Sequence, residues 1–578
     1  MKCDSVRPAC TPCSGARRAS ECEYNDGIII TKTQLLYAKL GNLERHLRFL
    51  QNSTSNYGHQ DSRRASPQLQ NNDSASSGEF PISPVSQTES NNHAFHSPST
   101  SGQTMEPGLP NSTFTIPRTI HESDFKSFSI ILLNAFLPHA QQCGLGIPSD
   151  ELVVRMSMSW SAGGVHRALK NAIWLWGCHF FAPASKDNFE TNFLRRALEG
   201  LHDLLNHSDR LLEAVQTSCL LSTYYFANVR MLEGSYHANT ASQLAKLGGL
   251  HQLRSGPSNG NSPNANSDVL MNFEFPSSAN SNRGHEELHA FWNTFVLERS
   301  WAGGSGRASP HWNSHDSKTI VTSPWPTDVG TDWAMDALGV DYPDGYSTAS
   351  STFENFLKYP TPSSCKSELR AKSVALWERS ISVEETKESI VPMAQPDEER
   401  WSEAHNALHS FYNKIPSLPH CTDRTSSYAE CMIFTAHALI HAADIRMHCH
   451  DAAYGNSDAH EHCMSAARKI EAAVNLLHDD DFPYLEPIVG ACWTICAAVL
   501  IRGLRKIPRQ SDSVPSERDT ISVQLENIAS AIARLGKVFP VAASQLNKIN
   551  AIRKLFEPET VLVAAGEDEC ACVRNTIS

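Results

Sequence analysis

Apolar residues recur at helical spacing through most of the chain from about residue 118 to residue 560, and this periodicity constrains the fold more than any other feature. In one clear stretch they lie three or four positions apart, at Ile521, Leu525, Ile528, Ile532 and Leu535. Two residues that commonly end a helix, Gly536 and Pro540, follow. Such spacing puts apolar side chains on one face of an α-helix. Similar stripes occupy residues 209–228 and 428–447, whereas alternating β-branched runs are scarce. The pattern predicts an all-α fold, with one large helical domain over residues 118–560.

The rest of the chain differs from this domain in composition. Residues 51–116 consist largely of Ser, Asn, Gln, Pro and Gly, and such a segment cannot bury enough apolar surface to offset the entropy of ordering. We therefore expect a disordered linker there, a surface insertion over residues 255–284 and a flexible tail over residues 561–578. A chain of 578 residues is also too long for one compact core.

Two features argue against secretion and against a membrane-spanning segment. No apolar stretch of the signal-peptide type follows Met1. The apolar run from Ile488 to Ile501 has 14 residues, which is too short to cross a bilayer and suits a buried helix. The sequence therefore predicts a protein that is neither secreted nor bound in a membrane.

Four of the 16 cysteines crowd into the first 22 residues, at Cys3, Cys10, Cys13 and Cys22. Closely spaced cysteines in a chain without a secretory signal are metal ligands more often than disulfides, because thiolates hold Zn²⁺ tetrahedrally. The segment is too small and polar to fold alone, so metal binding would supply its folding free energy. The alternative is four unligated thiols in a floppy tail. The other twelve cysteines are expected to be reduced residues of the core.

Charge is divided unevenly between the two ends of the chain. Residues 1–50 carry a net charge of +3 and residues 51–578 carry −16, which together give the total of −13. An acidic surface is repelled by nucleic-acid phosphate, so contact with DNA is expected at the N-terminus. The basic residues available there are Lys2, Arg7, Arg17 and Arg18.

Residues 29–50 carry leucines spaced alternately four and three residues apart, at Leu36, Leu40, Leu43, Leu47 and Leu50. This is the seam that one helix presents to a partner helix in a coiled coil. The segment therefore predicts a short coiled coil that pairs two copies of the chain. The alternative is a single amphipathic helix packed on its own domain, and Gly41 weakens either helix by roughly 1 kcal/mol.

The N-terminal segment KCDSVRPACTPCSGARRASECEY resembles the second part of the fungal binuclear zinc cluster, a six-cysteine DNA-binding module. The resemblance aligns the family's third to sixth cysteines with Cys3, Cys10, Cys13 and Cys22. Pro8 stands at the family's loop proline, and Lys2 at the basic residue before the third cysteine. The resemblance implies that the four cysteines bind Zn²⁺, and that Lys2, Arg7, Arg17 and Arg18 lie on DNA phosphates.

The family's first two cysteines and the basic helix between its second and third cysteines would lie before Met1. In the family that helix reads base edges in the major groove. Either the start codon is misplaced, or the protein has lost sequence-specific DNA reading. We expect a misplaced start, since the remaining half keeps its metal spacing.

Two segments of the helical region are similar to the middle homology region of the same transcription factors. In MLEGSYHANTASQLAKLGGLHQL (231–253), the matching positions are Ala241, Leu244, Ala245, Gly249, Leu250 and His251. In HAFWNTFVLERSWAGGSGRAS (289–309), they are Phe291, Trp292, Leu297, Glu298, Arg299, Gly306 and Arg307. The resemblance implies an all-helical regulatory domain. From the residues themselves we expect Phe291, Trp292 and Phe295 in the core, and Glu298 and Arg299 bound to different partners.

Patterns typical of enzymes are weak. His437 and His441 are four residues apart, and His448, Cys449, His450, His460, His462 and Cys463 follow. The second position of the zinc-hydrolase motif His-Glu-x-x-His is Ala438 here, so the general base is missing and we expect no catalysis. The glycines of residues 303–307 lack the Gly-Lys-Ser/Thr ending of a phosphate loop and predict a plain turn.

Taken with the resemblance, these features predict a nuclear, zinc-dependent, DNA-binding regulator of RNA polymerase II transcription, and not an enzyme. Its expected partners are DNA with GC-rich half-sites, a second copy of the chain and the transcriptional machinery, with no membrane contact. The alternative is a regulatory protein without DNA binding that acts through dimerisation and its helical domain.

Overall fold

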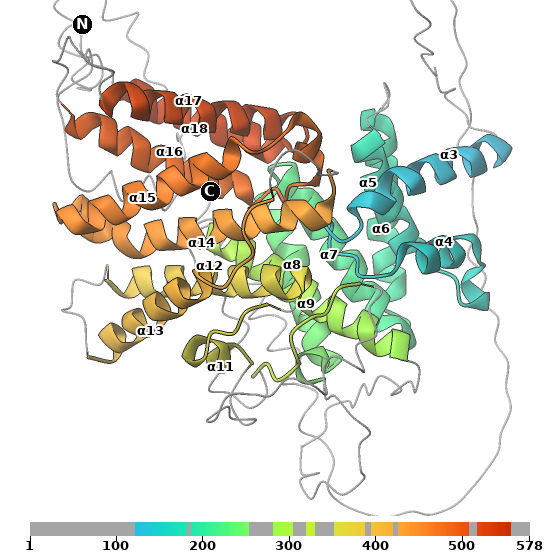
Figure 1. The fold of residues 1–578 in the computed structure, drawn as a ribbon. Helices are drawn as coiled ribbons and strands as arrows, with labels where there is room; N and C mark the ends of the chain where they lie inside the picture. Colours follow the sequence, from blue (N-terminus) through green and yellow to red (C-terminus); the bar gives the residue numbers. More distant parts are fainter. Residues whose placement is uncertain are drawn as a thin grey trace, which may run out of the picture. The chain divides into compact units, whose positions relative to one another are not determined.

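The computed structural model describes residues 122–181, 186–253, 281–304, 320–329, 352–363, 365–387, 395–419, 426–507 and 517–555, and all of them belong to one compact unit. Within these ranges the only regular elements are helices, so the predicted all-α fold is confirmed there. The longer helices, drawn in Figure 1, are α3 (Glu122–Phe136), α4 (Ser149–Ser157), α5 (Arg167–Phe181), α6 (Lys186–Leu204), α7 (Leu211–Ala227), α8 (Met231–Leu247), α9 (Ser281–Gly304), α11 (Thr352–Lys358), α12 (Lys366–Lys387), α13 (Gln395–Tyr412), α14 (Tyr428–Ala453), α15 (Ser457–Val474), α16 (Val489–Lys506), α17 (Glu517–Gly536) and α18 (Pro540–Leu555).

The helix expected around residues 521–535 is present as α17. All five apolar residues of its stripe are buried, and the helix ends at Gly536. Pro540 then opens α18, because its fixed φ and missing N–H suit the first turn of a helix. The amphipathic pattern therefore located both the helix and its buried face.

Helices α7 and α14 lie in the interior of the fold. Every residue of α7 from Leu212 to Ala227 is buried. Helix α14 packs against α12, α15 and α16, so it is covered on several sides. In Figure 1, α14 lies between α12 and α15. Residues 209–228 and 428–447 therefore do not form the one-faced stripes that their spacing predicts, because a helix that is buried all round has no polar face.

Helix α12 brings charged side chains into this interior. Glu384 pairs with Arg446 of α14 at 3.0 Å, and Glu378 pairs with Arg299 of α9. Lys372, which is completely buried, pairs with Glu368 at 2.7 Å. Buried charges are tolerated where they are paired and hydrogen-bonded, and removal of one partner is strongly destabilising. The pairs with Arg446 and Arg299 therefore fix how α12 lies against α14 and α9, whereas the pair of Lys372 with Glu368 lies within α12 itself.

The cysteines of the described ranges behave as expected for reduced core residues. Nine of them lie in the described ranges, none is joined in a disulfide there, and eight are buried. Burial raises the pKa of Cys492 to about 12. Such thiols are protonated near neutral pH and react poorly.

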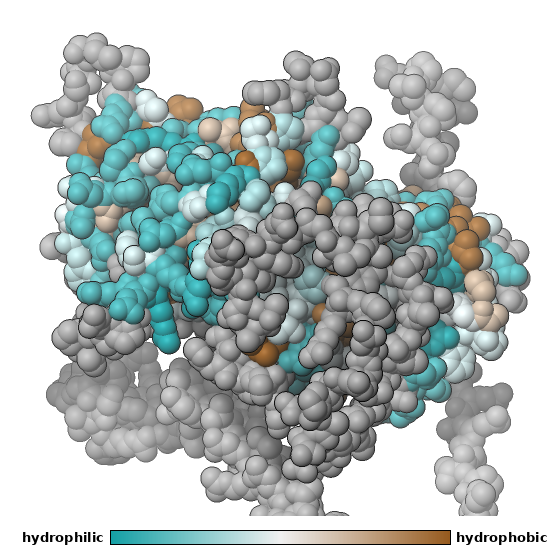
Figure 2. Space-filling view, turned by 60° about the horizontal axis from the view of Figure 1, so that its bottom comes forward, coloured by the Kyte–Doolittle hydropathy of each residue, from teal (hydrophilic) through white to brown (hydrophobic). Residues whose placement is uncertain are grey.

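On the face of the molecule shown in Figure 2, the coloured surface is mostly hydrophilic, with scattered hydrophobic residues. No helix in the described ranges is long and apolar enough to span a membrane. The segments expected as zinc module, coiled coil, linker and tail, at residues 1–25, 29–50, 51–116 and 561–578, lie outside the described residues. The expected insertion at 255–284 also lies mostly outside them, but α9 already begins at Ser281.

Helices α3 and α5 approach each other closely at Gly177, which leads to a prediction. A Cβ atom at Gly177 would lie 2.3 Å from the carbonyl oxygen of Leu132 in α3. Alanine would favour the helix by up to about 1 kcal/mol, but overpacking against backbone costs about 1–3 kcal/mol. We expect Gly177→Ala to lower the free energy of unfolding, as measured by urea denaturation.

The matched control is Gly503→Ala in α16. There the Cβ atom would meet the flexible end of Met464 at 3.0 Å, so the side chain has room to move. The control is expected to be near neutral or stabilising. If Gly177→Ala were as stable as the control, this result would contradict the close contact between α3 and α5.

Candidate metal centre

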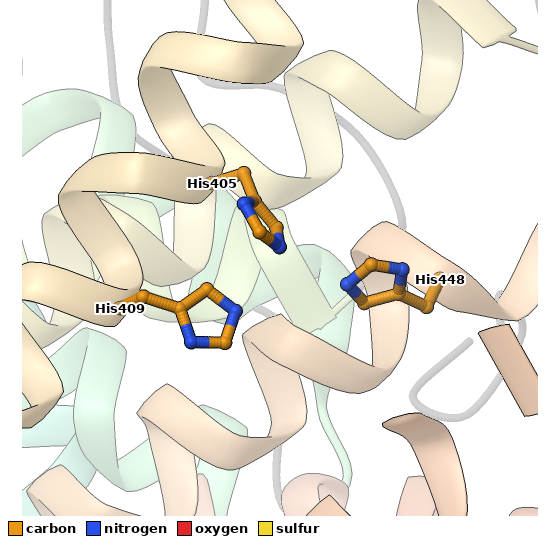
Figure 3. Close-up of side chains that lie close together, drawn as sticks. All are labelled: His405, His409 and His448. Carbon is orange, nitrogen blue, oxygen red and sulfur yellow. The ribbon is translucent and has the colours of Figure 1, made fainter. Parts of the chain in front are cut away.

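Two helices each present a pair of potential metal ligands that are four residues apart. Helix α13 carries His405 and His409, and helix α14 carries Asp444 and His448. Residues at this spacing lie on the same face of a helix. Figure 3 shows the rings of His405, His409 and His448 directed toward a common space between the two helices. Ligand pairs on facing helices are a common way to build metal sites in helical bundles.

The distances within this cluster are short. The Oδ1 atom of Asp444 lies 3.6 Å from Nε2 of His409 and 3.6 Å from Nε2 of His448. His405, His409 and His448 each offer one ring nitrogen, and these nitrogens all lie within 4.8 Å of one another. A second group of ligand atoms within the same limit consists of Asp444, His448 and His462 of α15. The two groups share His448.

Aromatic contacts orient the rings of the cluster. Trp401 stacks on His405 with ring centroids 4.9 Å apart, and it meets His448 edge-on at 5.8 Å. The Trp401 indole N–H donates to the carbonyl oxygen of Met447 at 3.4 Å, which anchors the indole to α14. On the other side, His462 stacks on His448 at 4.6 Å. These contacts restrict the orientations that His405 and His448 adopt.

Asp444 belongs to the enclosed part of the cluster, as does His448 with a side chain that is 9% exposed. The side chain of Asp444 is 12% exposed, whereas that of His409 is 41% exposed. Burial raises the pKa of Asp444, and the nearby positive or protonatable groups of His409, His462 and Lys469 oppose that rise. The Nζ atom of Lys469 lies over the ring of Tyr412, 4.7 Å from its centroid. The cluster is therefore enclosed at Asp444 and His448 and open to solvent at His409.

The histidine pair singled out by the sequence lies elsewhere on α14. His437 and His441 are both buried, and Nε2 of His437 lies 2.9 Å from the carbonyl oxygen of Pro416. Burial lowers the pKa of His441 to about 3, so its imidazole is neutral at physiological pH. Tyr412 packs against His441 at 4.9 Å. This pair is packed into the core, and the groups that could hold a metal in the described ranges lie farther along the helix.

Sequence reasoning missed His405, His409 and Asp444, although it noted His448 and His462 in a histidine-rich segment. The available signal was the spacing of four in His405-x3-His409 and again in Asp444-x3-His448. Either pair alone is common on a solvated helix. The site exists because the tertiary fold sets the two faces opposite each other.

Of the residues predicted to bind Zn²⁺ or DNA, none is in the described part of the chain. The cysteines Cys3, Cys10, Cys13 and Cys22 and the basic residues Lys2, Arg7, Arg17 and Arg18 all precede residue 122, where the description begins. Their metal and DNA roles therefore remain predictions.

The residues singled out in the helical region lie mainly in the core. Phe291, Trp292 and Phe295 of α9 are buried, as predicted. Their neighbours Glu298 and Arg299 bind different partners: Glu298 accepts a hydrogen bond from Ser242 of α8 at 2.7 Å, and Arg299 pairs with Glu378 of α12. The prediction that Glu298 and Arg299 bind different partners is therefore confirmed.

The segment 231–253 forms α8, a turn and a short 3₁₀ helix at Leu250–Gln252. Gly249 takes a φ of 67° in the turn, a conformation that favours glycine. The carbonyl oxygen of the buried His251 accepts hydrogen bonds from the backbone N–H groups of Thr322 and Ser323. Gly303 and Gly304 belong to the end of α9, so the turn expected at 303–307 does not begin at Gly303. The remaining residues of that segment lie outside the description.

Comparisons with known proteins do not assign the chain. No model of a known protein family matches it, and no curated protein matches it.

Proposed function

We propose that the protein is a zinc-dependent, DNA-binding regulator of RNA polymerase II transcription of the fungal zinc-cluster type. The observation that carries the proposal is the spacing of Cys3, Cys10, Cys13 and Cys22 within a basic N-terminal segment of an otherwise acidic chain. Thiolates at this spacing are suited to Zn²⁺, and the local positive charge is suited to phosphate. Nuclear localisation and pairing through the leucines of residues 29–50 are parts of the same proposal.

The helical domain supports a regulatory role in this proposal. Of the two segments that resemble the middle homology region, 231–253 supplies α8 and 289–304 supplies most of α9, and the contact between Glu298 and Ser242 joins them. Arg299 then links α9 to α12. The segments noted for their resemblance are therefore structural elements of one core, as expected for an all-helical regulatory domain.

Zinc-dependent DNA binding is a testable consequence. If Lys2, Arg7, Arg17 and Arg18 each contact one phosphate, the slope of log K against log salt concentration should be about −3.6 for each chain. Fluorescence anisotropy of a GC-rich duplex, titrated with the zinc-loaded full chain, measures this slope. Removing the zinc with a chelator, or introducing Cys10→Ser with Cys13→Ser, should abolish the salt-dependent binding. The matched control is Cys365→Ser, which changes a cysteine of the helical domain.

The competing function is a regulator that dimerises without binding DNA. Zinc-loaded chain that shows no salt-dependent DNA affinity, and that keeps its dimer after chelation, would favour this competing function. Mapping the 5′ end of the transcript is the complementary measurement. An in-frame Cys-x2-Cys followed by six mostly basic residues would complete the zinc cluster, whereas an upstream stop codon would exclude its recognition helix.

A further inference from the structure

We propose that the helical domain contains a second metal site, which binds one divalent transition-metal ion of the zinc class through His405, His409, Asp444 and His448. This inference concerns residues outside the N-terminal segment and does not rest on DNA binding. The ion would join α13 to α14.

The separations between ligand atoms carry the proposal. The two 3.6 Å distances from Asp444 Oδ1 to His409 Nε2 and to His448 Nε2 are too long for hydrogen bonds. They are close to the separation of about 3.3 Å between two ligand atoms that lie 2.0–2.1 Å from the same tetrahedral Zn²⁺. Asp444 Oδ1 therefore already lies at nearly the ligand-to-ligand separation of a zinc site from one histidine of each helix.

The environment of Asp444 provides a second, independent argument. Its Oδ1 atom is buried and accepts no hydrogen bond from the residues that the structure describes. A buried acceptor left without a partner is costly, and a charged one more so. A bound cation would satisfy this oxygen directly. Lys469 also acts on the carboxylate electrostatically, but its ammonium group is placed over the Tyr412 ring.

The ligand types select the class of metal. Three imidazoles and one carboxylate suit Zn²⁺, Co²⁺, Ni²⁺ or Cu²⁺, whereas Ca²⁺ and Mg²⁺ require mainly oxygen ligands. His405 is the fourth ligand in this proposal, because one of its ring nitrogens lies within 4.8 Å of a ring nitrogen of both His409 and His448. His462 instead lies nearly parallel to His448, at 14°, and so braces that ring. Four protein ligands close the coordination sphere, which is typical of structural rather than catalytic sites.

Metal binding at this position would act on the attachment of α13. The buried residues Ala404, Ala407, Leu408 and Phe411 pack α13 into the core, and the two histidines face α14 beside them. An ion bound by both helices stabilises the folded state and resists their separation. The stability of the helical domain would therefore depend on the bound metal, and α13 is the helix that would separate more readily without it.

The test uses untagged full chain in which Cys3, Cys10, Cys13 and Cys22 are all replaced by serine, so that only sites outside the N-terminal segment are measured. Co²⁺ and Zn²⁺ are titrated by calorimetry, and Co²⁺ is also followed by visible absorption. We expect one ion per chain, the visible bands of tetrahedral Co²⁺ without thiolate charge transfer, and a higher midpoint of thermal unfolding with Zn²⁺. Absence of binding in this background would overturn the inference while leaving the N-terminal zinc proposal intact.

Single substitutions test the ligand set. His409→Ala should weaken binding at least roughly tenfold, since even the loss of a residue that supports a ligand costs 10–100-fold. Its side chain is 41% exposed, so the variant should fold, and circular dichroism checks this. The matched control is His450→Ala, which removes a half-buried histidine from α14, the helix that carries Asp444 and His448, and should leave the affinity unchanged. Unchanged affinity in His409→Ala, or a larger loss in His462→Ala than in His405→Ala, would overturn the proposed ligands.

Discussion

Replacing Arg370 by methionine is expected to lower the free energy of unfolding by about 3–5 kcal/mol, because it leaves a buried carboxylate without its cation. The guanidinium donates to both oxygens of Glu486, at 2.6 and 3.1 Å, and to Oδ1 of Asn293 at 3.1 Å. Tyr428 also donates to Glu486, at 3.0 Å. Burial alone disfavours the charge on Arg370, yet Glu486 holds the pKa of Arg370 above its ordinary value. This one side chain ties α12 to α9 and to the segment before α16.

The measurement is urea denaturation followed by circular dichroism. Arg195→Met is the matched control, because Arg195 forms a 2.6 Å pair with Glu199 that is more than half exposed and should contribute less than about 1 kcal/mol. The double variant Arg370→Met with Glu486→Leu removes both charges and should regain much of the loss. If Arg370→Met cost no more than the control, the enclosed ion pair would not be a determinant of stability.

Replacing Trp377 by alanine is expected to destabilise the domain by a similar amount, about 3–5 kcal/mol. The side chain is completely buried in α12, and the Arg446 guanidinium lies 4.8 Å from the centroid of its ring. Its indole N–H donates to the carbonyl oxygen of Ser300 at 3.4 Å. Alanine would leave a cavity between α9, α12 and α14 and remove the ring that faces a buried cation.

Trp160→Ala is the matched control, since Trp160 is 43% exposed and its loss should cost less than about 1 kcal/mol. Trp377→Phe keeps an aromatic ring and should lose less than Trp377→Ala. Equal unfolding midpoints for Trp377→Ala and Trp160→Ala would contradict the packing around α12.

The sequence does not predict the close approach of α3 and α5. The sequence shows a glycine at position 177 but not that the backbone of Leu132 lies against it. Spacing patterns describe one helix at a time, whereas an interhelical contact depends on how two faces meet. The same limit applies to the histidine cluster. The sequence shows a spacing of four at His437 and His441, but the pairs that face each other across two helices are His405 with His409 and Asp444 with His448.

The sequence alone is sufficient to predict that the described region is helical, where a helix such as α17 lies and which of its faces is buried, because the 3.6-residue repeat is a local property that apolar spacing reports directly. It also determined that Phe291, Trp292 and Phe295 belong to the core and that Glu298 and Arg299 diverge, since neighbouring residues on a helix point in different directions. The partners of the buried side chains depend on the tertiary structure. Arg370 pairs with Glu486, which is 116 positions away, and α13 places His409 beside both Asp444 and His448. Such contacts depend on the packing of whole helices, so no local pattern in the chain specifies them.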